Sequence, residues 1–255
     1  MKILSAVSWS NNDDGNNNRV NRTSLLLRHT DCRRGSLLVA MLCHGGQNDG
    51  GMGIEDPMLI ATGYLVEQVK LWYEHNYLQI IYRNKPLSYI KNSLCSLLRV
   101  TEQDLWEYLL HENTRREQCE LGIGFSIMII WRRKYITLQS GEAKIRLFKS
   151  RPRNSFVDRL SQLSSSKRSR LLTMRKKKVK RGRHILTPNI IHKGSLRRGV
   201  GFLISDSGFG KRLSLNKLEE ALNPVELRSE SQISKRLAAI AAVSNDNTAI
   251  YLKGR

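Results

Sequence analysis

The stretch that decides the fold reads SLLLRHTDCRRGSLLVAMLCHGG and spans residues 24–46. Residues 24–28 are rich in leucine, which is typical of a strand, and residues 36–43 form an apolar run of strand length. Between them, residues 31–35 hold an aspartate, two arginines and a glycine, which favours a turn. We therefore predict a hairpin whose second strand ends in a glycine-rich loop, residues 44–53.

The rest of the chain contains groups of strands separated by groups of helices. One helix is predicted to start near Pro57, a second covers residues 87–98, and a third starts at Thr101, whose spacing to Asp104 suggests a capping box. Further strands are expected at residues 122–131, 134–139, 144–149, 185–186, 202–204 and 248–253, with a turn at 194–199 and helices from Ser214 and over 231–243. This order favours an α+β layered sandwich of antiparallel sheets over a parallel fold.

Positive charge is concentrated in one part of the sequence. The 255 residues include 43 Lys and Arg against 22 Asp and Glu, a net charge of +21. Residues 151–200 hold sixteen of these basic residues and one acid, a net +15. We predict a basic, exposed and mobile loop at about residues 151–183. Its cations could contact a polyanion by releasing counterions, or could form a solvated loop without a partner; they include Arg175, Lys176, Lys177, Lys178, Lys180, Arg181 and Arg183.

Composition argues against several classes of protein. No window approaches about 18 uninterrupted apolar residues, so no transmembrane segment is expected. The apolar run in residues 1–7 is too short for a signal peptide, and a cytoplasmic location is predicted. The cysteines at positions 32, 43, 95 and 119 form no close pairs, so free thiols are expected rather than disulfides or a zinc site.

Four separated segments, in order along the chain, carry a resemblance to a known family. They are RVNRTSLL at residues 19–26, VAMLCHGG at 39–46, GEAK at 141–144, and FLISDSGF at 202–209, the last followed by ALNP at 221–224 and DNT at 246–248. In order and spacing they resemble the signatures R-x-x-N-E-D, D-G-M-G-G, G-D-S-R and S-D-G-F of bacterial PPM (PP2C-type) Ser/Thr protein phosphatases. The resemblance covers about residues 1–149 and 184–255.

The resemblance implies both a fold and a reaction. The fold is one domain over residues 1–255, with two antiparallel sheets packed face to face and a pair of helices on each outer side. The reaction uses two Mn²⁺ or Mg²⁺ ions, held chiefly by four aspartates, to activate a water molecule against a phosphate monoester.

This sequence departs from the family at most of the aspartate positions. Thr23, His44 and Ser207 stand where three of the aspartates are expected, and Asp246 keeps the fourth. Asp206 is adjacent to Ser207, and alternation along the strand would turn it to the opposite face. A one-residue insertion would restore Asp206 to the site.

The leading expectation is a pseudophosphatase in signalling, with no catalytic group and no cofactor. It would bind a protein or phosphoprotein partner, with Arg19 at the family's phosphate-binding position. One alternative is a polyanion-binding module that uses residues 167–183. The other is an active metal-dependent Ser/Thr protein phosphatase with Mn²⁺ or Mg²⁺ held by Asp206, Asp246, His44 and Glu142.

Overall fold

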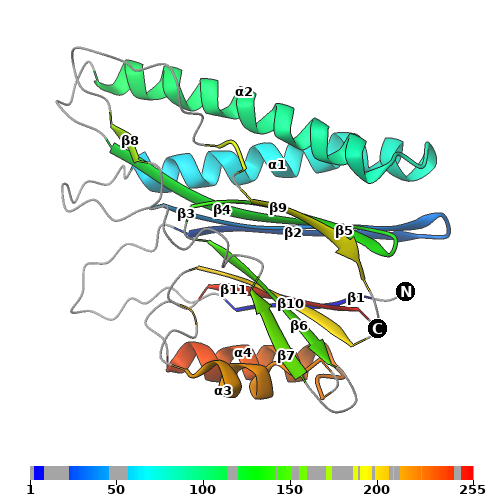
Figure 1. Cartoon of the computed structure of the whole chain (residues 1–255). Coiled ribbons are helices and arrows are strands. Elements are labelled where there is room, and N and C mark those ends of the chain that lie inside the picture. Colours follow the sequence, from blue (N-terminus) through cyan, green and yellow to red (C-terminus); the bar gives the residue numbers. More distant parts are fainter. Residues whose placement is uncertain are drawn as a thin grey trace.

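The molecule is a layered sandwich. In the computed structural model, two antiparallel sheets lie face to face, and each has helices on its outer side (Figure 1). The α+β sandwich predicted from the sequence is confirmed. The described residues are 3–8, 23–45, 57–113, 120–141, 143–150, 155–159, 171–173, 186–188, 190–196, 199–206, 209, 213–224, 226–243 and 248–254.

The first sheet is built around the predicted hairpin. Its strands follow the order β2 (Thr23–Cys32), β3 (Gly35–Gly45), β4 (Glu120–Trp131), β5 (Lys134–Ser140) and β9 (Ile190–Ser195), and the short β8 (Leu171–Thr173) also pairs with β4. The register is antiparallel throughout, with Cys32 opposite Gly35 at the hairpin turn and Thr23 opposite His44 at the far end.

The second sheet combines strands from distant parts of the sequence. Its order is β1 (Ile3–Ser8), β11 (Ala249–Gly254), β10 (Val200–Ser205), β6 (Lys144–Ser150) and β7 (Ser155–Arg159). The first strand lies beside the last, with Ile3 opposite Gly254.

β3 is apolar from Leu37 to Cys43, where both of its faces are covered. Its odd-numbered residues from Leu37 to Cys43 pack beneath the long helices α1 (Pro57–Tyr82) and α2 (Leu87–Asn113). Its even-numbered residues from Leu38 to Leu42 pack against the second sheet. Fully burying one such leucine contributes about 1.5–3 kcal/mol, so this strand is central to the stability of both layers.

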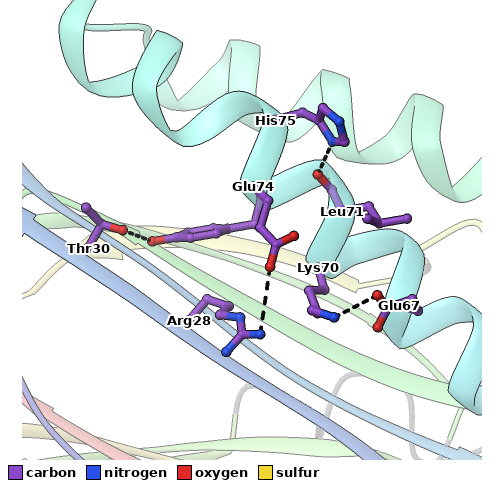
Figure 2. Close-up of polar contacts among 8 residues, drawn as sticks. Arg28, Thr30, Glu67, Lys70, Leu71, Glu74 and His75 are labelled. Carbon is purple, nitrogen blue, oxygen red and sulfur yellow. Dashed lines mark hydrogen bonds and ion pairs between the residues drawn. The ribbon is translucent and has the colours of Figure 1, made fainter.

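Polar contacts link α1 to β2. The Tyr73 hydroxyl donates to Thr30 Oγ1 over 2.7 Å, and Arg28 lies 3.8 Å from the Glu74 carboxylate (Figure 2). The ion pair is solvent-accessible and contributes at most about 1 kcal/mol. The hydrogen bond from the buried Tyr73 is therefore the more important of the two contacts.

The prediction of a helix boundary between residues 98 and 101 is wrong, because α2 is continuous over Leu87–Asn113. Leu94, Leu98 and Leu105 form one buried face across the expected break. Thr101 lies buried within the helix, where it cannot act as an N-cap. Burial of this face outweighs the local capping signal.

Two shorter helices cover the second sheet, α3 (Leu215–Ala221) and α4 (Glu230–Ala242). Ser214 caps α3 as predicted. Ser229 and Gln232 form a reciprocal capping box at the start of α4. No helix in the described part of the chain is long and apolar enough to span a membrane.

Several strands differ from the sequence-based expectation. β1, β7, β8 and β9 are not predicted, and the strand expected at 185–186 is wrong because Leu186 lies in a bend. The turn predicted at 194–199 starts too early, because Gly194 and Ser195 lie within β9, whereas Gly199 does lie in a turn. A Cβ on Gly194 would approach the Tyr135 hydroxyl to 2.6 Å, so glycine accommodates this ring.

Only parts of the expected basic loop fall within the described residues. β7 and β8 account for residues 155–159 and 171–173. The seven cations from Arg175 to Arg183 lie outside the described residues, as does Cys119. The thiols of Cys32, Cys43 and Cys95 are free.

Candidate functional site

One end of the sandwich brings together two positions identified in the sequence. Thr23 begins β2, His44 lies near the end of β3, and the hairpin register pairs them directly. Thr23 Oγ1 and His44 Nδ1 form a hydrogen bond of 3.0 Å. Thr23 is buried and His44 is half-buried. The hydroxyl and the imidazole are therefore held together at the rim of the sandwich.

Both side chains belong to the face between the sheets. Leu38, Ala40 and Leu42 of β3 pack into the cluster between the sheets, and His44 continues this alternation. Thr23 shares the face because directly opposed residues of antiparallel strands project to the same side.

Alternation along β10 determines the side on which Asp206 lies. Phe202 and Ile204 pack between the sheets, whereas Leu203 packs beneath α3 and α4. Continued by one step beyond the strand, the alternation places Asp206 on the face between the sheets. Ser207 lies outside the described residues, so which of the two corresponds to the family's aspartate stays a prediction.

Contacts between the sheets show that β3 and β10 run in the same direction. Near the β2–β3 turn, the ring of Tyr135 contacts the ring of Phe202, with centroids 4.8 Å apart. Further from that turn, the Gln139 side chain accepts a hydrogen bond from the β6 residue that pairs with Ile204. Asp206 therefore lies at the same end of the sandwich as the hydrogen-bonded pair of β2 and β3.

The Asp206 carboxylate is bonded to the backbone of Phe209. Its Oδ1 accepts a hydrogen bond of 2.8 Å from the Phe209 backbone N–H. The Ser205 hydroxyl donates to the Asp206 carbonyl oxygen over 3.1 Å. Asp206 is 4% exposed, and the Phe209 ring is fully buried among the side chains of α3 and α4. One carboxylate oxygen is thus occupied by a local bond to the backbone, a role that aspartate commonly has.

A buried polar pair that was not predicted from the sequence lies further into the sandwich than His44. Ser126 and Gln139 are opposite each other on β4 and β5, and Ser126 is also opposite Leu42. Gln139 Oε1 accepts from the Ile145 N–H, but Gln139 Nε2 and Ser126 Oγ have no hydrogen-bond partner among the described residues. The available signals were Ser126, which interrupts an apolar run, and Gln139, which ends the next one.

Cys43 precedes His44 but cannot act with it as a nucleophile. Its side chain is fully buried among the residues beneath α1, on the opposite face of the sheet from His44. Burial raises the pKa of the Cys43 thiol well above its ordinary range.

Other predicted site residues fall outside the described part of the chain: Arg19, Glu142, Ser207 and Asp246. Within the described ranges, no three His, Cys, Asp or Glu side chains gather closely enough to hold a metal ion.

The described donors do not fit a pair of hard divalent cations. Mg²⁺ and Mn²⁺ favour carboxylate oxygens, which also offset their charge. Thr23 contributes a neutral hydroxyl and His44 an imidazole whose Nδ1 is engaged with that hydroxyl. Asp206 contributes one carboxylate, with an oxygen already bonded to the backbone. The described residues thus supply too little negative charge for two divalent ions.

Comparisons with known proteins rest on structure alone. No protein-family model matches the sequence, and no curated protein matches it significantly. A mutant bacterial serine phosphatase is similar with a TM-score of 0.65 and 13% identity, over 99% of this chain and 97% of that one.

Two further structures have the same arrangement. PppA, a key regulatory component of the T6SS in Pseudomonas aeruginosa, is similar with a TM-score of 0.60 and 14% identity, over 99% of this chain and 97% of that one. The catalytic domain of the Ser/Thr protein phosphatase PstP, in complex with two manganese ions, has a TM-score of 0.59 and 12% identity, over 98% of this chain and 96% of that one. The chain therefore has the fold of the PPM-type Ser/Thr protein phosphatases.

Proposed function

We propose that this chain is a pseudophosphatase, which binds a protein or phosphoprotein partner in signalling and does not hydrolyse phosphate. The observation that carries the proposal is the Thr23–His44 hydrogen bond, at positions where the resemblance implies metal-binding aspartates. A neutral hydroxyl and an imidazole offset none of the charge of two divalent ions. Without paired ions, hydroxide is not available near neutral pH to attack a phosphate monoester.

The charge of the molecule supports the same proposal. A chain with a net charge of +21 disfavours capture of cations and favours approach of an anionic group. Binding of a phosphorylated partner is thus compatible with the absence of hydrolysis. PppA, which has the same fold, is described as a regulatory component, and this is consistent with a role through protein contacts.

Metal affinity and turnover test the proposal on the full chain. We expect no appreciable turnover of p-nitrophenyl phosphate or of a phosphopeptide with Mn²⁺ or Mg²⁺. In calorimetric titrations, the double variant Thr23→Asp/His44→Asp should bind Mn²⁺ at least about tenfold more tightly than the parent, because two carboxylates then face the metal. The matched control is Thr23→Asn/His44→Asn, because asparagine has nearly the shape of aspartate but no charge. This control should bind Mn²⁺ no more tightly than the parent. Adding Ser207→Asp should strengthen Mn²⁺ binding further.

An active enzyme is the alternative that one observation favours, namely the place of Asp206 on the face between the sheets. If the parent turns over phosphopeptide at about 1 s⁻¹ or faster, and EDTA or Asp206→Asn abolishes that activity, the pseudophosphatase proposal is wrong. Polyanion contact through Arg175–Arg183 stays a prediction. Salt-dependent retention on heparin would check it.

A further inference from the structure

The end of the sandwich opposite Thr23 and His44 carries a dense group of cations. Three connections meet there: the β2–β3 turn, the α1–α2 connection and the β4–β5 turn, at the right of Figure 1. We call this surface the basic end, and it consists of Arg33, Arg34, Arg83, Lys85, Arg132, Arg133 and Lys134. Residues 31–35, 83–86 and 132–134, which form these connections, contain one acid, Asp31.

A pocket of about 580 Å³ opens between the α1–α2 connection and the β4–β5 turn. Its volume is in the range of sites that hold a small molecule or a few residues of a peptide. The described residues that line it include four cations and no acid: Asn84, Lys85, Pro86, Leu87, Trp131, Arg132, Arg133 and Lys134. Pro86 and Leu87 add an apolar wall.

Hydrogen bonds link the three connections to one another. Arg34 Nη1 donates to the Tyr82 carbonyl and Arg132 Nη2 to the Arg34 carbonyl, both over 3.5 Å. The Arg132 backbone N–H donates to the Ser36 carbonyl over 2.9 Å. The cations are therefore presented by a connected framework rather than by independent loops, which lowers the entropy cost of binding.

Arg132 occupies a backbone conformation that glycine would adopt more easily. Its φ is +59°, and a non-glycine residue there costs about 1 kcal/mol or more. In this conformation its guanidinium lies over the Trp131 ring, 5.0 Å from the centroid. Arg34 over Tyr82 and Lys85 over Tyr89 repeat the arrangement, at 4.9 Å and 4.5 Å. Cation–π contacts thus help to hold like charges close together.

We propose that the basic end binds an acidic segment of a protein partner, with glutamate or aspartate on the pocket cations and an aliphatic side chain on Pro86 and Leu87. Mutual repulsion raises the free energy of the unbound cations, and carboxylates relieve it on binding. Arginine guanidinium groups bind carboxylates with two parallel hydrogen bonds. This surface lies a strand length away from Thr23 and His44, so the proposal goes beyond the proposed function.

Nucleic acid fits the basic end less well. Base stacking in the pocket needs an open aromatic face, but Trp131, the aromatic residue of the pocket lining, is 4% exposed and already carries the Arg132 guanidinium over its ring. Four of the seven cations also line one pocket, an arrangement that suits a compact acidic ligand better than an extended phosphate backbone.

Fluorescence anisotropy on the full chain tests the proposal with a labelled peptide of alternating Glu and Leu. A peptide with Gln in place of Glu is the matched ligand. At about 0.15 M salt, the triple variant Lys85→Gln/Arg133→Gln/Lys134→Gln should bind the Glu peptide at least about tenfold more weakly than the parent. The control Lys217→Gln/Lys235→Gln/Arg236→Gln removes the same charge from exposed positions of α3 and α4 and should bind as the parent does.

The other outcomes overturn the proposal. The proposal is wrong if the Glu peptide does not bind, if the Gln peptide binds equally tightly, or if the two triple variants lose peptide affinity equally. It is also wrong if a DNA oligonucleotide of equal charge binds the parent more tightly than the Glu peptide does and the pocket variant no longer binds that DNA. Circular dichroism checks the fold of each variant. If the pocket variant does not fold, the single change Arg133→Gln replaces it and should weaken peptide binding about threefold, whereas Arg236→Gln should not.

Discussion

Single residues inside the sandwich show where polar groups stabilise the protein and where they do not. The Ser126 hydroxyl is fully buried and has no hydrogen-bond partner among the described residues, whereas Gln139 accepts a bond from the Ile145 N–H. The two side chains are neighbours in register but should respond oppositely to substitution.

We predict that Ser126→Ala leaves the free energy of unfolding unchanged or raises it by about 1 kcal/mol, because a buried hydroxyl without a partner is unfavourable. Gln139→Leu should lower it by about 1–3 kcal/mol, because the buried Ile145 N–H loses its acceptor. Urea unfolding of the two variants measures both changes. A clear loss of stability in Ser126→Ala would show that its hydroxyl is satisfied.

A second residue-scale prediction concerns alkaline pH. The Tyr251 hydroxyl is buried and donates to the Leu222 carbonyl over 2.9 Å, and burial raises its pKa well above the ordinary value near 10. Above pH of about 10 the unfolded chain loses this proton while the folded protein keeps it, so stability falls as pH rises.

Tyr251→Phe should therefore reduce stability by about 1 kcal/mol at neutral pH, yet make the decline above pH of about 10 shallower. Denaturant unfolding of parent and variant from pH 8 upward measures both effects. Equal slopes in the two proteins would contradict the assignment of this decline to Tyr251. The exposed Tyr82 offers a control at neutral pH, since Tyr82→Phe removes a solvent-accessible hydroxyl and should leave the stability there unchanged.

At the scale of elements, the continuity of α2 is the main difference from the sequence-based prediction. Val100 is exposed and lies where a break between two helices was expected. Val100→Pro should lower the free energy of unfolding by about 3 kcal/mol or more, because proline inside a helix removes a hydrogen bond and clashes with the preceding turn. Val100→Ala is the matched control and should be nearly neutral. A small effect of proline would mean that the helix is broken there.

Elements with a strong local pattern were predictable. The hairpin of β2 and β3 follows from two apolar runs around a polar turn, and its register then brings Thr23 to His44. β9 was not predicted, because it has few strongly apolar residues and because its glycine favours a turn in a sequence-based prediction. In the structure its residues alternate in exposure. The helix boundary at Thr101 was wrong because capping signals are local, while burial of Leu98 and Leu105 depends on α1.

At the scale of the whole molecule, long-range pairing limits what a sequence can reveal. β1 pairs with β11 across almost the whole chain, and six residues with no neighbouring partner give no strand signal. The face of the sheet on which Asp206 lies was not predictable for the same reason, because that face is defined by packing against the other sheet. The buried contacts of Ser126 and Gln139 exist only once β4, β5 and β6 are assembled.

Net charge also acts on the whole molecule. With a charge of +21, self-repulsion is greater in the compact state than in the unfolded chain. The thermal unfolding midpoint should rise as NaCl increases from about 0.01 M to about 0.1 M, where the Debye length falls from about 30 Å to about 10 Å. Glycine betaine, a zwitterion without net charge, serves as the control for osmolality. A midpoint that falls with NaCl would show that local ion pairs dominate.

The double burial of β3 has a consequence for native-state dynamics. Its odd-numbered side chains belong to the helix-covered layer and its even-numbered side chains to the layer between the sheets, so neither layer can open while the strand stays protected. Amide hydrogens of residues 38–42 should then exchange with deuterated water only through global unfolding, whereas those at the exposed positions of β9 should exchange through local fluctuations. The opening free energy measured at β3 would thus equal the stability of the whole fold.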